Sequence, residues 1–383
     1  MKKLLFLFAL VAVGAGVLAA SGSAATNAGA CGVQSPREGT THFGGVISAS
    51  AIAGTCAVHN TSDPANGLPP LLYWGGPVMA NSSSAPMTVT PIFWNPSGGG
   101  HPMSTNYKST ITGYLSNVAA SSGLNTNVFS VSTEYWGTNG TIGNAIRLGK
   151  SIDDSHALPA SACTVASNDT TNIYADGTGY NACLSDDQVT AEIQRVIDAG
   201  HLPQNDYSHM YVIYLPKHVE SCFFAGTTLD SSNACTINHQ PSAAYCAYHS
   251  MMGPNWPDFG TIYANMPFPI YSSAVGFTCG SDAGGGTLQS PNHNLDADTE
   301  ISPTSHEINE AITDPNVYNG WFDIAGFENG DECAYVFGAM AGKSGQMYNQ
   351  VINGAKYLTQ EEFSNTDYAD TGGGCVQSEA AVG

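Results

Sequence analysis

Ten cysteines set the strongest constraint on how this chain of 383 residues can fold. Their number is even and all of them follow an apolar leader, so we expect up to five disulfide bonds. No two cysteines have CxxC spacing, so a structural zinc site held by cysteines is not expected. The local pairs predicted are Cys163 with Cys183 and Cys333 with Cys375, while Cys222, Cys235 and Cys246 compete for partners. The connectivity of the rest, Cys31, Cys56 and Cys279, does not follow from the sequence.

The leader predicts an oxidising compartment. Two lysines precede the apolar run LLFLFALVAVGAGVLAA, and small residues follow it, as in a secretory signal peptide. We place cleavage near Ala25, so residues 1–25 form the signal. A membrane anchor is the weaker interpretation, because the apolar run is short and contains two glycines. Residues 26–70 are rich in Gly, Ser, Ala and Thr, which predicts a poorly ordered lead-in. Residues 71–383 are expected to form a single domain of a secreted, extracellular protein.

Charged residues are scarce and mostly acidic. They make up 11% of the chain, against roughly 25% in an average globular protein. Acidic residues number 31 and basic residues 10, so no cationic surface is available to neutralise phosphates. A nucleic-acid partner and an anionic membrane are therefore not expected. We expect a monomer without stable membrane insertion, whose partner is an extracellular peptide or cell-wall polymer.

Strand and helix patterns alternate after residue 70, which predicts an α+β domain with an α/β-like order and a mixed sheet. Strands are predicted at residues 87–96, 127–137, 209–216 and 260–268, and helices at residues 106–123, 185–200 and 303–314. The run 209–216 is almost continuously apolar and should be a central strand, whereas its asparagine and proline make 260–268 a candidate edge strand. The last 70 residues look irregular, glycine-rich and tied by disulfides.

The segment SHEINEAITDP, residues 305–315, concentrates charge in a charge-poor chain. Ser302 and Pro303 predict the start of its helix, and Pro315 predicts its end. Four ionisable side chains fall within an arc of about 100° on that helix: His306, Glu307, Glu310 and Asp314. One interpretation is an acidic, solvent-facing helix start, which accounts for Glu307. The other is a metal-binding HExxE helix, in which two ligands one turn apart accompany a general base.

The segment HEINEAITDP resembles the active-site helix of the thermolysin-like gluzincins, whose pattern is His-Glu-x-x-His-Ala-x-Thr-Asp. The matching residues are His306, Glu307, Ala311, Thr313 and Asp314. The chain departs from the pattern at Glu310, where that family has its second zinc histidine. The resemblance implies a zincin-like domain in which His306 and Glu310 bind a metal. It also implies that Glu307 is the catalytic general base for attack of water on a carbonyl.

In gluzincins the third ligand is a carboxylate roughly twenty residues further along the chain. The segment FENGDEC lies at that distance and offers Asp331 and Glu328. Asp331 is preferred because Cys333 would fix its loop if bonded to Cys375, and Glu328 is the alternative ligand. These acids could instead simply face water in a glycine turn.

The predicted cofactor is a divalent metal, zinc by resemblance. Ligation by one imidazole and two carboxylates is rich in oxygen, and such ligation suits Mn²⁺, Fe²⁺ or Ca²⁺ better. It also acidifies water less than a histidine-rich site does. Three further residues are candidates for contacts to a transition state: Tyr318, Trp321 and His249.

A longer resemblance, from about residue 72 to residue 375, is to the secreted Exordium-like or phosphate-induced proteins of plants and their bacterial relatives. It rests on the segments GGPVM, VTPIFWNP, CAYHS, YANMPF, SHEINEAITDP, GWFDIAGFENGDECAYVFG and YNQVINGAKYLTQEEFSN, and on Cys375. It implies a secreted protein tied to the cell wall and growth, without a settled reaction.

Three functions follow as expectations. The first is a metal-dependent peptidase or other amide hydrolase. The second is a non-catalytic extracellular protein that binds cell-wall carbohydrate on the same fold. The third is a structural secreted protein in which the HExxE helix only packs.

Overall fold

The computed structural model describes the sheet, the helices and every candidate site residue except Tyr318. The described residues are 70–81, 85–97, 103–165, 173–174, 176–223, 235–236, 245–255, 259–270, 279, 287–317, 319–323 and 326–379. The predicted signal peptide, the lead-in up to residue 69, Cys31 and Cys56 lie outside them. Within these ranges no helix combines the length and the apolar character needed to cross a membrane.

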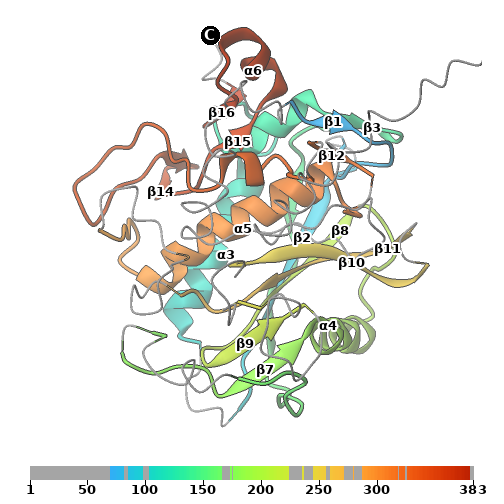
Figure 1. Ribbon diagram of the computed structural model, residues 1–383, viewed down its shortest axis with the longest axis vertical. Helices are drawn as coiled ribbons and strands as arrows, with labels where there is room; N and C mark the ends of the chain where they lie inside the picture. The colour runs from blue at the N-terminus through green and yellow to red at the C-terminus, as the bar shows by residue number, and fades with distance from the viewer. Residues whose placement is uncertain are drawn as a thin grey trace, which may run out of the picture.

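A mixed sheet forms the centre of the described structure (Figure 1). Its strands run in the order β10–β11–β8–β2–β5, and β6 also pairs with β2. Their bounds are β2 Met87–Trp94, β5 Ile146–Leu148, β6 Ile152–Asp154, β8 His209–Tyr214, β10 Tyr248–Asn255 and β11 Phe259–Met266. β10 and β11 are antiparallel, and the other neighbours are parallel. The α+β class predicted from the sequence is confirmed.

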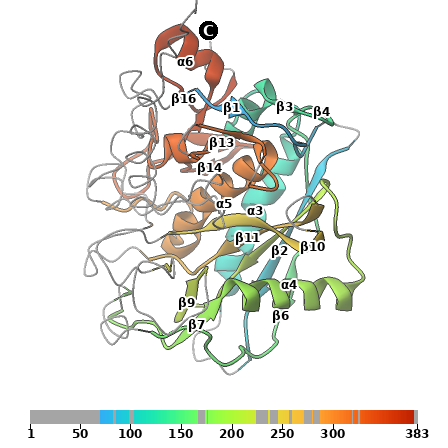
Figure 2. The same ribbon diagram turned by 45° about the vertical axis from the view of Figure 1, so that its right-hand side comes forward.

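Helices cover both faces of this sheet. They are α3 Thr105–Ala120, α4 Asp186–Gly200 and α5 Leu295–Thr313. In β8, Met210, Val212 and Tyr214 join the core formed with α3 and α5, whereas Tyr211 and Ile213 join the core formed with α4. Figure 2 shows α4 across the sheet from α3 and α5. Because both faces are covered, the strand is apolar without alternation, and its predicted central position is confirmed.

The prediction of an edge strand at residues 260–268 is wrong, because β11 lies between β10 and β8. Pro267, which suggested an edge, follows the last strand residue and therefore removes no donor from the ladder. Asn265 is buried within the strand, and its side-chain amide donates a hydrogen bond to Ser221 Oγ at 2.6 Å, which offsets part of the cost of burial.

α5 begins at Leu295, earlier than the predicted start at Pro303. The side chain of Asn294 caps it by accepting a hydrogen bond from the backbone N–H of Ala297 at 3.2 Å. Pro303 therefore lies inside the helix, where a proline typically costs about 3 kcal/mol because it removes a donor and crowds the preceding turn. Every residue from 297 to 313 is buried, and we attribute the intact helix to this packing.

The predicted strand at residues 127–137 is also wrong. The chain forms the 3-10 helix η5, Val128–Glu134, followed by the short strand β3, Trp136–Gly137. The side chain of Asn127 accepts from Phe129 N at 3.1 Å, and Ser130 Oγ donates to Asn127 O at 2.7 Å. Such local side-chain bonds to the backbone compete with a sheet ladder.

Short elements complete the described structure. They are β1 Leu72–Tyr73, β4 Gly140–Thr141, β7 Ala182–Ser185, β9 Val219–Cys222, β12 Trp321–Phe322, η9 Asp331–Cys333, β13 Gln350–Ile352, β14 Ala355–Tyr357, β15 Glu362–Phe363, α6 Asn365–Thr371 and β16 Cys375–Val376. The strands pair as β1–β12, β3–β4, β7–β9, β13–β14 and β15–β16.

Four disulfide bonds join all the described cysteines. Two were predicted, Cys163–Cys183 and Cys333–Cys375. The other two, Cys222–Cys235 and Cys246–Cys279, settle the competition among the central cysteines. A fifth bond, between the two cysteines outside the described residues, stays a prediction.

Candidate metal centre

Three elements bring the candidate site residues together. The C-terminal half of α5 supplies His306, Glu307 and Glu310. The turn leading into η9 supplies Glu328, and η9 itself begins with Asp331. All five side chains are buried, with exposed fractions of 0–2%. The solvent-facing interpretations of the helix and of the glycine turn are therefore wrong.

His306, Glu310 and Asp331 converge on one region. His306 Nε2 lies 2.7 Å from Glu310 Oε1 and 3.6 Å from Asp331 Oδ1. Potential ligand atoms of all three residues lie within 4.8 Å of one another. The sequence offered Asp331 and Glu328 as alternatives for the third ligand, and the structure places Asp331 in this group. The side chain of Glu328 lies instead near His249, with Oε1 3.8 Å from His249 Nε2.

Backbone contacts hold the turn against the helix. The backbone N–H of Asp331 donates to Glu310 Oε1 at 3.0 Å, and the N–H of Glu328 donates to Asp331 Oδ2 at 3.3 Å. Gln360 donates through its side-chain amide to Gly330 O at 2.6 Å. These bonds fix the direction of the Asp331 carboxylate toward α5, as a ligand loop requires.

The structure adds His249, which the sequence offered only as a transition-state contact. His249 lies on β10, and its Nδ1 is 3.4 Å from Glu307 Oε2 and 3.5 Å from Glu310 Oε2. These three residues form a second group whose potential ligand atoms lie within 4.8 Å of one another. Because β10 is distant from α5 in the sequence, no spacing rule could have found this residue; a histidine inside a buried strand was the only signal.

Several atoms that face the cluster are buried without a hydrogen bond. They are Nδ1 of His249, Nε2 of His306, Oε2 of Glu310 and Oδ1 of Asp331. Although His306 Nε2 is close to Glu310 Oε1, the pair lacks hydrogen-bond geometry. Buried polar atoms are normally paired, so a set of ligand-type atoms left unpaired around one region fits a cation.

The pKa values of the two histidines and of Glu310 are shifted in the direction that favours their charged forms. Burial lowers the pKa of His306, but the charge of Glu310 outweighs it and raises the pKa to about 10. Burial likewise opposes the charged form of His249, yet Glu328 and its neighbours raise its pKa well above the usual value. Burial raises the pKa of Glu310, but the charge of His306 lowers it to about 2.

The pKa values of the remaining carboxyl groups are shifted in the direction that favours their neutral forms. Burial raises the pKa of Glu307, and it raises the pKa of Glu328 and Asp331 well above the usual values. More acids are buried around the cluster: Asp314, Asp323, Glu332 and Glu362. Among the described residues no lysine or arginine is buried. Protons on the two histidines and on carboxyl groups therefore balance the charge, and a cation would displace them.

Trp321 belongs to an aromatic cluster beside the sheet. Its ring lies 4.5 Å from that of Trp136 and 5.3 Å from that of Tyr73, centroid to centroid. Its indole N–H donates to the backbone oxygen of Trp136 at 2.7 Å, so this donor is already used. Tyr318 lies outside the described residues.

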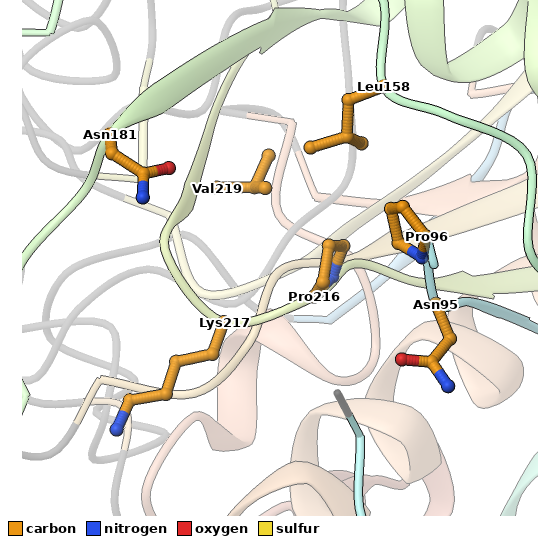
Figure 3. A pocket seen from close by; sticks show the side chains of 7 residues that line it. All are labelled: Asn95, Pro96, Leu158, Asn181, Pro216, Lys217 and Val219. Atoms are coloured by element: carbon orange, nitrogen blue, oxygen red, sulfur yellow. The ribbon is translucent and has the colours of Figure 1, made fainter. Parts of the chain in front are cut away.

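Two surface hollows lie away from the cluster. Figure 3 shows the smaller, lined by Asn95, Pro96, Leu158, Asn181, Pro216, Lys217 and Val219. Its volume is about 30 Å³, enough for about one water molecule. The larger, about 350 Å³, lies beside Arg195 and Leu202. Neither hollow includes a residue of the cluster.

Gly330 packs directly against the imidazole of His306. A Cβ atom at this position would lie 2.7 Å from His306 Nδ1, although the backbone angle φ of −73° suits any residue. We expect Gly330→Ala to displace the imidazole, to lower the free energy of unfolding by about 1–3 kcal/mol through overpacking, and to weaken metal binding. Thermal unfolding and metal titration measure both effects.

Gly113 on α3 is the matched control, because a Cβ atom there meets nothing within 4 Å. Gly113→Ala should gain about 0.5–1 kcal/mol in stability and leave metal binding unchanged. Equal metal affinity in Gly330→Ala and wild type would contradict the placement of His306 as a ligand.

No protein-family model, no curated protein and no solved structure matches this chain.

Proposed function

We propose that this chain is a secreted, metal-dependent amide hydrolase of Exordium-like type, with a zincin-like centre. In this proposal His306, Glu310 and Asp331 hold one divalent ion. A single observation carries it: these three side chains converge in a buried region, and His306 Nε2, Glu310 Oε2 and Asp331 Oδ1 lack hydrogen bonds. The substrate is an extracellular peptide or an amide-bearing cell-wall polymer. The four disulfide bonds support an oxidising compartment.

The donor set fits a divalent cation. One imidazole and two carboxylates provide the three protein ligands of a catalytic centre that keeps an open position. Burial raises the pKa of Glu328 and Asp331 well above the usual values, and a divalent ion bound there would displace the protons that otherwise balance the charge. Zinc is compatible with these ligands, and the oxygen-rich set favours Mn²⁺ or Fe²⁺ as well.

The chemistry follows from the arrangement around the ligands. A bound divalent ion supplies a Lewis acid that polarises a carbonyl and makes water more acidic. Glu307 adjoins the ligand Glu310 one turn along α5 and serves as the general base that takes the proton from water. The backbone N–H of Asp331 holds the carboxylate of Glu310 in place. Glu328 in turn holds the carboxylate of Asp331 through its own backbone N–H and not through its side chain.

A second candidate function is a non-catalytic extracellular protein that binds cell-wall carbohydrate. The complete burial of the centre favours it, because an ion enclosed there would join α5 to the turn before η9 without meeting a substrate. Trp136 offers an exposed aromatic face, 47% accessible, beside Tyr73 and Trp321. Aromatic rings with one wet face are typical of binding surfaces.

Metal analysis of purified protein tests the centre. Wild type should retain at least one equivalent of Zn²⁺ or Mn²⁺ after dialysis, and Glu310→Ala should retain none. Glu300→Ala is the matched control, since Glu300 lies on the same helix and is equally buried but belongs to neither ligand group. It should bind as wild type does. Wild type that retains no metal, after loading with either ion, would contradict the proposal.

Hydrolysis distinguishes the two functions. Metal-loaded wild type should cleave a peptide library, a chelator should abolish cleavage, and added metal should restore it. If metal-loaded wild type shows no turnover above that of Glu310→Ala, the ion has only a structural role, and the carbohydrate-binding function is favoured.

A further inference from the structure

We propose that the centre holds two cations, and that the second lies between His249, Glu307 and Glu310, with Glu310 as the bridging ligand. This inference rests on the metal site proposed above and adds a position to it. The three residues come from β10 and α5, and their potential ligand atoms lie within 4.8 Å of one another. All three side chains have an exposed fraction of 0%.

The hydrogen bonding of His249 fixes which ring nitrogen faces the position. Its Nε2 lies 3.0 Å from the backbone oxygen of Asp314, which can only accept, so Nε2 carries the hydrogen. Nδ1 then presents a lone pair toward Glu307 and Glu310 when the ring is neutral. Metal-binding histidines commonly donate their other N–H to a backbone carbonyl in this way.

Nδ1 of His249 lies at the distances from two carboxylate oxygens that are expected between atoms that bind the same ion. It lies 3.4 Å from Glu307 Oε2 and 3.5 Å from Glu310 Oε2, and it makes no hydrogen bond. Without an ion, a proton on Nδ1 would lie between the ring and these two carboxylates, and a cation could take the place of that proton. Ligands about 2.0–2.2 Å from one ion lie roughly this far apart.

Glu310 faces both positions with different oxygen atoms. Its Oε1 lies 2.7 Å from Nε2 of His306, whereas its Oε2 lies 3.5 Å from Nδ1 of His249. A carboxylate that uses one oxygen for each of two ions is a bridge. Two-metal hydrolytic sites hold their ions about 3.5–4 Å apart. The two groups share Glu310 and no other residue, which is the arrangement expected of such a pair.

A further buried carboxyl group lies near the second position. Glu328 Oε1 lies 3.8 Å from His249 Nε2, and both oxygens of Glu328 are buried without a hydrogen bond. Because the hydrogen of Nε2 goes to Asp314 O, Glu328 makes no hydrogen bond to His249 and would act on the ring only through its charge, once a bound ion favours the ionised carboxylate. Glu328, predicted from the sequence as a ligand, would then act through His249. When both ions are bound, Glu307 becomes a ligand of the second ion.

Manganese titration tests the second position without reference to activity. Wild type should bind two Mn²⁺ per chain, and electron paramagnetic resonance should show the coupled signal of neighbouring ions. His249→Gln should bind one Mn²⁺ with an uncoupled signal, because glutamine keeps an amide donor for Asp314 O but lacks the lone pair of Nδ1. Glu307→Gln is the second variant and should also bind one, while Glu300→Ala should bind two.

The outcomes separate this inference from the proposed function. One Mn²⁺ in wild type, retained by His249→Gln and lost by Glu310→Ala, overturns the second position and leaves the first intact. No Mn²⁺ and no Zn²⁺ in wild type overturns both. Two uncoupled ions would place the second ion elsewhere and would also overturn the inference. Thermal unfolding of each variant confirms that a lost ion does not reflect a lost fold.

Discussion

Glu307→Gln is expected to lower turnover by about 10²–10⁴-fold when only the first ion is bound, the usual cost of losing a general base, because Glu307 is free to act as the base only while the second position is empty. Glutamine keeps the size of the side chain but cannot accept the proton of water. The ion held by His306, Glu310 and Asp331 should remain, so metal content should fall from two to one and not to zero. Hydrolysis of a peptide library and metal analysis of the same preparations measure both quantities.

His249→Gln is the matched control for this prediction, because it too should release only the second ion. If Glu307 is the base when one ion is bound, Glu307→Gln should be the slower of the two variants. Equal rates would mean that the second ion, and not a base at this position, carries the effect. Turnover of Glu307→Gln equal to that of wild type would exclude Glu307 from the chemistry.

Replacement of Cys333 and Cys375 by serine is expected to lower the free energy of unfolding by about 2–5 kcal/mol. The bond joins η9 to β16 across 42 residues. Because Asp331 and Cys333 share η9, we also expect metal affinity to fall by about 10–100-fold, as it does when groups that support ligands are lost. Denaturant unfolding and metal titration measure the two effects.

The control is replacement of Cys163 and Cys183 by serine, which removes another disulfide while leaving η9 and α5 unaltered. It should destabilise the protein to a similar extent and leave metal affinity unchanged once the variant is folded. Equal losses of affinity in both double variants would mean that general destabilisation, not the hold on Asp331, governs binding.

Local signals predicted several elements correctly. α4 starts at a capping box formed by Ser185 and Gln188, and both residues lie within one turn of each other in the sequence. β8 was predicted correctly because a strand buried on both faces is apolar almost throughout and shows no alternation of apolar and polar residues. The edge strand was misplaced because Pro267 was counted as part of a strand that ends one residue earlier. At residues 127–137 an apolar, β-branched run favoured a strand, but side-chain bonds from Asn127 and Ser130 favoured a 3-10 turn.

The candidate centre was predictable where its residues share one helix or match the resemblance to the gluzincins. His306 and Glu310 follow from their spacing of one helical turn, whereas Asp331 was suggested by the distance at which gluzincins have their third ligand, together with the expected Cys333–Cys375 bond. His249 was offered only as a transition-state contact and Gly330 was not singled out, because their roles depend on how β10 and the turn before η9 pack against α5. The length of α5 was underestimated since Pro303 is an ordinary helix start in a sequence, and only tertiary burial keeps it inside a helix.

The parallel core of the sheet has a consequence for how the protein is made. Thr88 of β2 pairs with His209 of β8, and Met210 of β8 pairs with Ile262 of β11. During synthesis β2 must wait until more than half of the chain has emerged before its neighbour β8 exists. Pairing between such distant segments makes folding slow and leaves strand edges exposed meanwhile. We therefore expect the newly made chain to depend on folding helpers until β8 is in place.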